Sequence, residues 1–125
     1  MAVIKTFRDL QVWQKAHALV LEVYRITKAF PSHEMYGLIS QLRRAVISVA
    51  SNIVEGFKRR SVQDSIHFYN MADASLEEVK YQLLVAHDLE YINKQIYGQV
   101  LELAEEVSKM LRRWIQSQRN NSLPT

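Results

Sequence analysis

Four stretches of the chain repeat apolar residues at alternating steps of three and four, and this period constrains the fold more than any other feature. Such spacing places the side chains on one face of an α-helix. The stretches predict helices at about residues 9–29, 34–57, 62–90 and 93–117, with a frayed tail at 118–125. Their apolar stripes are Trp13, Ala16, Val20, Val23, Thr27 and Phe30; Leu38, Leu42, Ala45, Val49 and Ile53; Tyr69, Ala72, Leu76, Val79, Leu83 and Ala86; and Ile96, Val100, Leu103, Val107, Met110 and Trp114.

Breaks and caps separate these stripes. Pro31 disfavours helix at the residue before it, and Ser32 is expected to cap the second helix. The segment from Ser61 to Asp64 resembles a capping box, and Asn93 is expected to cap the fourth helix. Connections of a few residues between helices of this length predict one all-α domain over residues 1–125, an antiparallel up-down-up-down four-helix bundle.

Composition excludes several classes of protein. With three Gly and two Pro in 125 residues, the chain has too few turn residues for a β-sandwich or barrel. No apolar run approaches a membrane span, and no secretory signal is evident. The absence of cysteine agrees with a reducing compartment, so we expect a cytoplasmic protein with no membrane contact.

The sequence contains no strong pattern for a metal, a cofactor or catalysis. Di-iron bundles need paired Glu-x-x-His motifs, and the nearest pattern here is one unpaired Asp64-Ser65-Ile66-His67, so we expect no metal site and no cofactor. Arg60 followed by His67 resembles the Arg-x(4-6)-His element of the HEPN ribonucleases, in which the pair handles phosphate charge and proton transfer. Such pairs also arise by chance, and we expect the protein not to be an enzyme.

The predicted fourth helix has more apolar surface than one bundle core requires. A second stripe, displaced by about 100° from the first, contains Tyr97, Leu101, Ala104, Leu111 and Ile115. One interpretation is a face that contacts another subunit. The alternative is a broad core face covered by the first and third helices.

Charge is distributed unevenly along the chain. Residues 1–60 carry ten basic and four acidic side chains. Residues 61–110 carry three basic and nine acidic side chains, and residues 111–125 carry three basic and no acidic side chains. The adjacent Lys58, Arg59 and Arg60 suit phosphate, and the other candidate contacts are Arg43, Arg44, Arg112 and Arg113. Binding of nucleic acid would then be directed at the backbone and depend strongly on salt. The alternative is that the basic and acidic helices pair with each other through complementary faces, and that the basic turn at residues 58–60 is only solvated.

A polar row runs along the predicted second helix. Its members are Arg44, Ser48, Ser51, Asn52 and Glu55. Polar rows inside bundles usually fix register or subunit contacts, and the remaining interpretation is a surface for a ligand or nucleic acid.

The chain resembles the four-helix-bundle family of proteins encoded by intervening sequences of 23S ribosomal RNA genes, over about residues 7–112. The segments that carry the resemblance are FRDLQVWQKAHAL, FPSHEMYGLISQLRRAVISVASNIVEG and ASLEEVKYQLLVAHDLEYI. The residues that match the family pattern are Trp13, Gln14, Lys15, Arg43, Arg44, Ser51, Asn52, Glu55, Gly56, Ser75, Glu78 and Gln82. Residues that differ from common family choices are Ala50, Val54, Ala74 and Lys80.

The resemblance implies a ring-shaped homopentamer with no established catalytic activity. The family also looks related to the accessory variability protein of diversity-generating retroelements, a basic pentamer that binds nucleic acid and the reverse transcriptase. We therefore expect a homo-oligomer that binds structured RNA or DNA through phosphates, with a further protein partner open. The alternative is a structural or protein-interaction scaffold that binds no nucleic acid.

Overall fold

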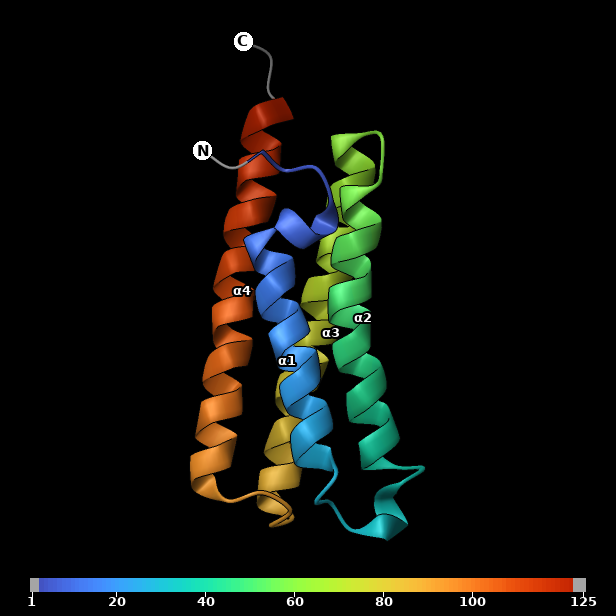
Figure 1. The fold of residues 1–125 in the computed structure, drawn as a ribbon, viewed down its shortest axis with the longest axis vertical. Coiled ribbons are helices and arrows are strands. Elements are labelled where there is room, and N and C mark those ends of the chain that lie inside the picture. Colours follow the sequence, from blue (N-terminus) through green and yellow to red (C-terminus); the bar gives the residue numbers. More distant parts are fainter. Residues whose placement is uncertain (1–2, 123–125) are drawn as a thin grey trace.

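The protein is an antiparallel bundle of four helices in a computed structural model that describes residues 3–122 (Figure 1). The long helices are α1 (Gln11–Thr27), α2 (Leu38–Phe57), α3 (Val62–Asp88) and α4 (Lys94–Ser122). Two short 3-10 helices, η1 (Phe7–Asp9) and η2 (Ser32–Glu34), precede α1 and α2. The predicted all-α, up-down-up-down bundle is confirmed.

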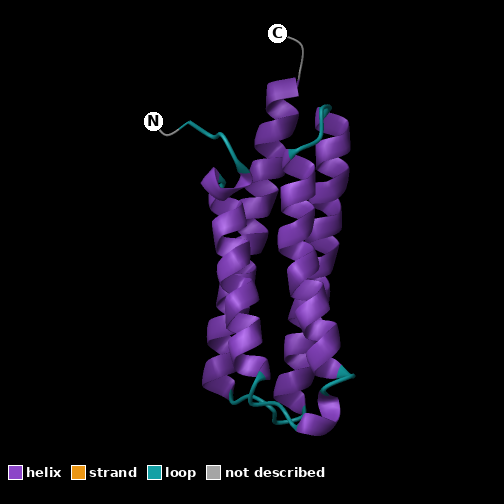
Figure 2. Cartoon of the chain, turned by 45° about the vertical axis from the view of Figure 1, so that its right-hand side comes forward, coloured by secondary structure: helices purple, strands orange, loops and turns teal. Residues whose placement is uncertain are grey.

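Each long helix contacts two neighbours, so the four form a square in cross-section. The contacting pairs are α1 with α2, α2 with α3, α3 with α4 and α1 with α4. The connections between α1 and α2 and between α3 and α4 lie at one end of the bundle, and the α2–α3 turn lies at the other (Figure 2). Short loops require this antiparallel order.

The predicted stripes form the core. Apolar side chains from all four helices fill it, and many have no exposed surface: Leu19, Val23, Leu42, Val46, Val49, Ile53, Leu76, Val79, Leu83, Val107 and Leu111. Burial of each such side chain contributes about 1.5–3 kcal/mol before entropic costs. None of the helices in residues 3–122 combines the length and the apolar character that a bilayer span requires.

Two helix starts were predicted correctly and one was wrong. The Ser61 hydroxyl accepts a hydrogen bond from the Asp64 backbone at 3.1 Å, and the Asn93 side chain accepts one from the Ile96 backbone at 2.8 Å. The helix α2, however, starts at Leu38 rather than near residue 34, because residues 32–34 form the separate turn η2. The Glu34 carboxylate, not Ser32, accepts a hydrogen bond from the Leu38 N–H at 3.2 Å.

The predicted fraying after residue 117 is wrong as far as residue 122, because α4 continues to Ser122. Ile115 is buried, and the Gln116 amide donates to the Asn120 side chain at 3.0 Å, so packing and a local hydrogen bond both extend the helix. The rest of the predicted tail, residues 123–125, lies outside the described residues.

The two apolar stripes of α4 are both used within the chain. Val100, Ala104, Val107, Leu111 and Ile115 are buried, and all the remaining apolar side chains of the two stripes except Leu101 are half-buried against the core. The broad core face therefore accounts for most of the apolar surplus of α4, and a subunit contact through α4 stays a prediction. Large apolar side chains are exposed elsewhere, on α1, α2 and α3 and in the connections.

Candidate nucleic-acid interface

Cations gather at the end of the bundle that carries the α2–α3 turn. This basic end, defined as residues 3–9, 55–64 and 109–122, contains nine Lys and Arg side chains and three Asp and Glu side chains. The opposite end, defined as residues 22–37 and 85–97, contains three Lys and Arg side chains and four Asp and Glu side chains. Folding thus places the excess of basic side chains at one end of the bundle and leaves the other end without such an excess.

The α2–α3 turn holds one of its three cations in place and leaves two in solvent. The Arg59 guanidinium forms an ion pair with Glu55 at 2.7 Å and lies 4.2 Å from the centre of the Phe68 ring. Lys58 and Arg60 are exposed and form no ion pair within residues 3–122. Phe68 was not among the predicted residues, because its ring comes from the second turn of α3, beyond the basic run itself.

Arg112 and Arg113 lie on α4 at the same end, on another corner of the bundle (Figure 1). Both are exposed and unpaired in the part of the chain that the structure describes. Arg113 also lines a hollow of about 460 Å³ together with Leu10 and Trp114. The basic end therefore presents separate cations on two corners rather than one continuous patch.

One acidic side chain at the basic end, that of Asp9, accepts hydrogen bonds from the backbone. The Asp9 carboxylate accepts hydrogen bonds from the N–H groups of Thr6 at 3.0 Å and Lys5 at 2.8 Å. These bonds, with the Thr6 bond the stronger cause, hold the pKa of Asp9 below its usual value. Asp9 thus forms a capping box with Thr6 at the start of η1 and forms no ion pair with an arginine within residues 3–122.

Arg43 and Arg44 lie away from the basic end, nearer the start of α2. The Arg43 guanidinium donates to the Thr27 hydroxyl at 2.9 Å and the Tyr24 carbonyl at 3.4 Å, and lies 4.6 Å from the centre of the Tyr24 ring. Arg43 therefore joins α2 to α1. Arg44 is exposed and unpaired within residues 3–122.

The polar row of α2 divides into a packed part and an exposed part. The Ser48 hydroxyl lies 2.9 Å from the Ser75 hydroxyl of α3, and the Asn52 amide donates to the Ser48 carbonyl at 2.9 Å and hydroxyl at 3.0 Å. This part fixes the register of α2 against α3. The exposed part consists of Arg44, Ser51 and Glu55.

Ion pairs between helices join some of the basic and acidic side chains that lie in different segments of the sequence. Lys15 of α1 pairs with Glu106 of α4 at 3.3 Å. Lys80 of α3 pairs with Glu77 at 2.8 Å and with Glu105 of α4 at 3.0 Å. Burial lowers the pKa of Lys80, but these two carboxylates outweigh it and leave the pKa raised. The ion pairs among residues 3–122 leave Lys58 and Arg60 of the α2–α3 turn without an acidic partner.

The structure does not join the residues of the ribonuclease-like pattern. Arg60 lies in the turn, whereas His67 lies on α3 with its ring 5.5 Å from that of Phe68. No hydrogen bond connects Arg60 and His67 in residues 3–122. Over the same residues, no three His, Asp or Glu side chains gather as metal ligands would.

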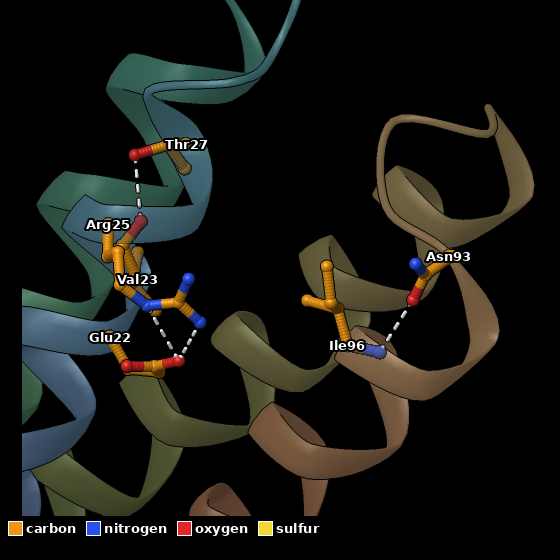
Figure 3. A network of polar contacts seen from close by, with 6 residues as sticks. All are labelled: Glu22, Val23, Arg25, Thr27, Asn93 and Ile96. Carbon is orange, nitrogen blue, oxygen red and sulfur yellow. Dashed lines mark hydrogen bonds and ion pairs between the residues drawn. The ribbon is translucent and has the colours of Figure 1, made fainter.

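Polar groups at the opposite end serve the fold. The Tyr91 hydroxyl donates to Glu34 at 2.8 Å, which ties the α3–α4 connection to the start of α2. Figure 3 shows three further local contacts near this end: Glu22 pairs with Arg25, the Thr27 hydroxyl donates to the Val23 carbonyl, and Asn93 caps α4. This end has two exposed lysines, Lys28 and Lys94, but no excess of basic over acidic side chains.

Comparisons with known proteins agree with this fold. The family model of the 23S rRNA-intervening sequence protein matches residues 8–113. A crystal structure of a protein of unknown function from the S23 ribosomal protein family of Bacteroides thetaiotaomicron superposes with a TM-score of 0.78 at 24% identity, covering 83% of this chain and 97% of that one. No curated protein matches. The relation to the accessory variability protein stays a prediction. The match over residues 8–113 assigns the chain to the 23S rRNA-intervening sequence protein family.

Proposed function

We propose that this protein is a non-enzymatic homo-oligomer, a pentamer as the family resemblance implies, that binds structured RNA or DNA through phosphate contacts at its basic end. The observation that carries the proposal is a set of exposed cations at one end that have no ion pair within residues 3–122: Lys58, Arg60, Arg112 and Arg113. Cations without such partners are available to replace the counterions of a phosphate backbone.

The arrangement supports contact with phosphates rather than with base edges. The four cations occupy two corners of one end, so they would contact phosphates at separate places on a folded nucleic acid. The Phe68 ring is already covered by the Arg59 guanidinium, which leaves it poorly placed to stack on a base. We therefore expect weak sequence preference and strong dependence on salt.

A scaffold that binds only protein is the second candidate. Its support is the exposed apolar surface away from the basic end, where Tyr36 is 96% exposed and Met35, which lines the same hollow, is 49% exposed. Large exposed apolar side chains near one another are typical of interaction surfaces. In this case the basic end would have no ligand.

The test compares two neutralised pairs of lysine and arginine residues. One variant combines Lys58→Gln with Arg60→Gln at the basic end, and its matched control combines Lys28→Gln with Lys94→Gln at the opposite end. Fluorescence anisotropy with a labelled structured RNA should show binding about a hundredfold weaker for the first variant at 0.1 M salt, since each lost phosphate contact removes nearly one decade. Equal losses in both variants, or no binding by the parent protein, would overturn the proposal.

A further inference from the structure

We propose, building on the phosphate binding in the proposed function, that the hollow at the basic end holds one unpaired nucleotide of the bound nucleic acid. Arg113 would bind the phosphate of this nucleotide, and Trp114 would stack on its base. The base would then lie between the start of α1 and the last turns of α4, outside the stack of its own strand.

The hollow has the size and the lining of a ligand site. Its volume is about 460 Å³, and ligand pockets generally have volumes of about 300–1,000 Å³. The apolar part of the lining comprises the buried side chains of Leu10 and Val12, the half-buried Met110 and Trp114, and the exposed Ile4. An apolar lining with a few polar groups is typical of sites that take a flat organic ring.

Trp114 supplies a large aromatic surface that the fold holds in place. Its ring centre lies 6.3 Å from that of the buried Tyr69, with an angle of 69° between the two planes. The indole is therefore fixed by the core on one side, and it lines the hollow on another. Bases of every kind stack on such a ring. Phe68 at the same end is different, because the Arg59 guanidinium already covers it.

The polar groups of the hollow suit the two parts of a nucleotide. Arg113 is exposed and has no ion pair within residues 3–122, so its guanidinium is available for a phosphate. Asp9 also lines the hollow, and both of its backbone hydrogen bonds end on Oδ2. Within the same residues no hydrogen bond reaches Oδ1, which can therefore accept one from the amino group of a base such as adenine.

The hollow adjoins the other predicted phosphate contacts. The helix α1 starts and α4 ends at the basic end, which also carries Lys58 and Arg60 on the α2–α3 turn (Figure 1). A helical nucleic acid held there by its phosphates would present an unpaired nucleotide to the hollow. Such a nucleotide leaves its stack at lower cost than a paired one, and the bases of bulges and loops are the ones that proteins reach in RNA.

The test compares two labelled RNA duplexes that differ only in a single bulged adenine. Fluorescence anisotropy should show that the parent protein binds the bulged duplex about tenfold more tightly, because stacking on Trp114 adds to the phosphate contacts. Equal binding of the two duplexes would overturn the inference and leave the proposed phosphate binding intact. No binding of either duplex would overturn both.

Arg112 and Arg113 provide a matched pair of variants. Both are exposed and without an ion pair in residues 3–122, but of the two only Arg113 lines the hollow. Arg112→Gln should weaken the binding of both duplexes by the same factor, whereas Arg113→Gln should weaken that of the bulged duplex more. Ser117→Leu enlarges an exposed side chain of the lining and should bring the bulged duplex down to the affinity of the plain one. A preference that survives both Arg113→Gln and Ser117→Leu would overturn the inference.

A free nucleotide is the other source of the same chemistry. AMP titrated into the parent protein should bind only at millimolar concentration, since it brings one phosphate instead of several. Binding of AMP at micromolar concentration would overturn the assignment of the hollow to nucleic acid. Thermal unfolding of the three variants, expected to match the parent, confirms that the substituted chains are folded.

Discussion

The two ends of the bundle use charged side chains differently. At the opposite end, Glu34 caps α2 and accepts a hydrogen bond from Tyr91. At the basic end, Lys58 and Arg60 have no partner within the described chain. The opposite end therefore uses these polar groups to stabilise the fold, whereas the basic end keeps two cations that the fold does not need. Mutations of Glu34 and Tyr91 should therefore change stability alone, and mutations of Lys58 and Arg60 should change binding alone.

The largest effect on stability is expected at the basic end, from backbone packing rather than charge. Gly56 lies where α2 crosses α3, and a Cβ atom there would come within 2.5 Å of the buried Tyr69 ring and 3.0 Å of the Ser65 carbonyl. Gly56→Ala should therefore lower the free energy of unfolding by about 1–3 kcal/mol. Urea denaturation measures this change, and a variant as stable as the parent would show that α2 and α3 separate easily here.

A stabilising change is expected at the opposite end from Glu90→Gly. Glu90 lies two residues after the end of α3 and has a left-handed backbone conformation, with φ of 64°. The Tyr91 N–H donates to the Ala86 carbonyl at 2.8 Å, and the Glu90 N–H donates to the His87 carbonyl at 2.9 Å. Such helix ends favour glycine because a Cβ atom is strained in this conformation. The substitution should raise the free energy of unfolding by about 1 kcal/mol. A loss of stability in urea would contradict this account of the α3 end.

Gly98→Ala is the matched opposite of Gly56→Ala. A Cβ atom at Gly98, in the first turns of α4, would meet no atom within 4 Å. Alanine should therefore add helix propensity without a clash and raise the free energy of unfolding by up to about 1 kcal/mol. Thermal unfolding of the two variants side by side checks the difference in sign. Equal shifts would show that packing at Gly56 does not decide its effect.

The smallest effect is a change in pH dependence at the opposite end. The Leu38 N–H and then the Tyr91 hydroxyl hold the pKa of Glu34 below its usual value. The resulting stability is present above the pKa of an unfolded glutamate, about 4.3, and is lost as the pH falls through the lower folded value. Glu34→Gln should therefore flatten the acid limb of a plot of unfolding free energy against pH. An unchanged slope would show that other carboxylates cause the loss of stability at low pH.

Sequence periodicity predicted the four helices because the core residues repeat in register with the helix. It failed at the start of α2, since a cap formed by Glu34 from inside a short 3-10 turn has no fixed spacing signal. It also failed to distinguish Arg43, which packs on Tyr24, from Arg44, which is exposed, because adjacent arginines look alike until the neighbouring helix is placed. The shared position of Arg60 and Arg113 at one end likewise depends on folding, since 53 residues separate them.

The most direct test of the central claim is the salt dependence of nucleic-acid binding by the parent protein. Fluorescence anisotropy with labelled structured RNA and duplex DNA gives the observed binding constant over a series of salt concentrations. If Lys58, Arg60, Arg112 and Arg113 each neutralise one phosphate, the logarithm of that constant should fall with the logarithm of salt at a slope of about −3 to −4. A slope near zero, or no binding at micromolar protein in low salt, would contradict the claim that the basic end is a phosphate-binding surface.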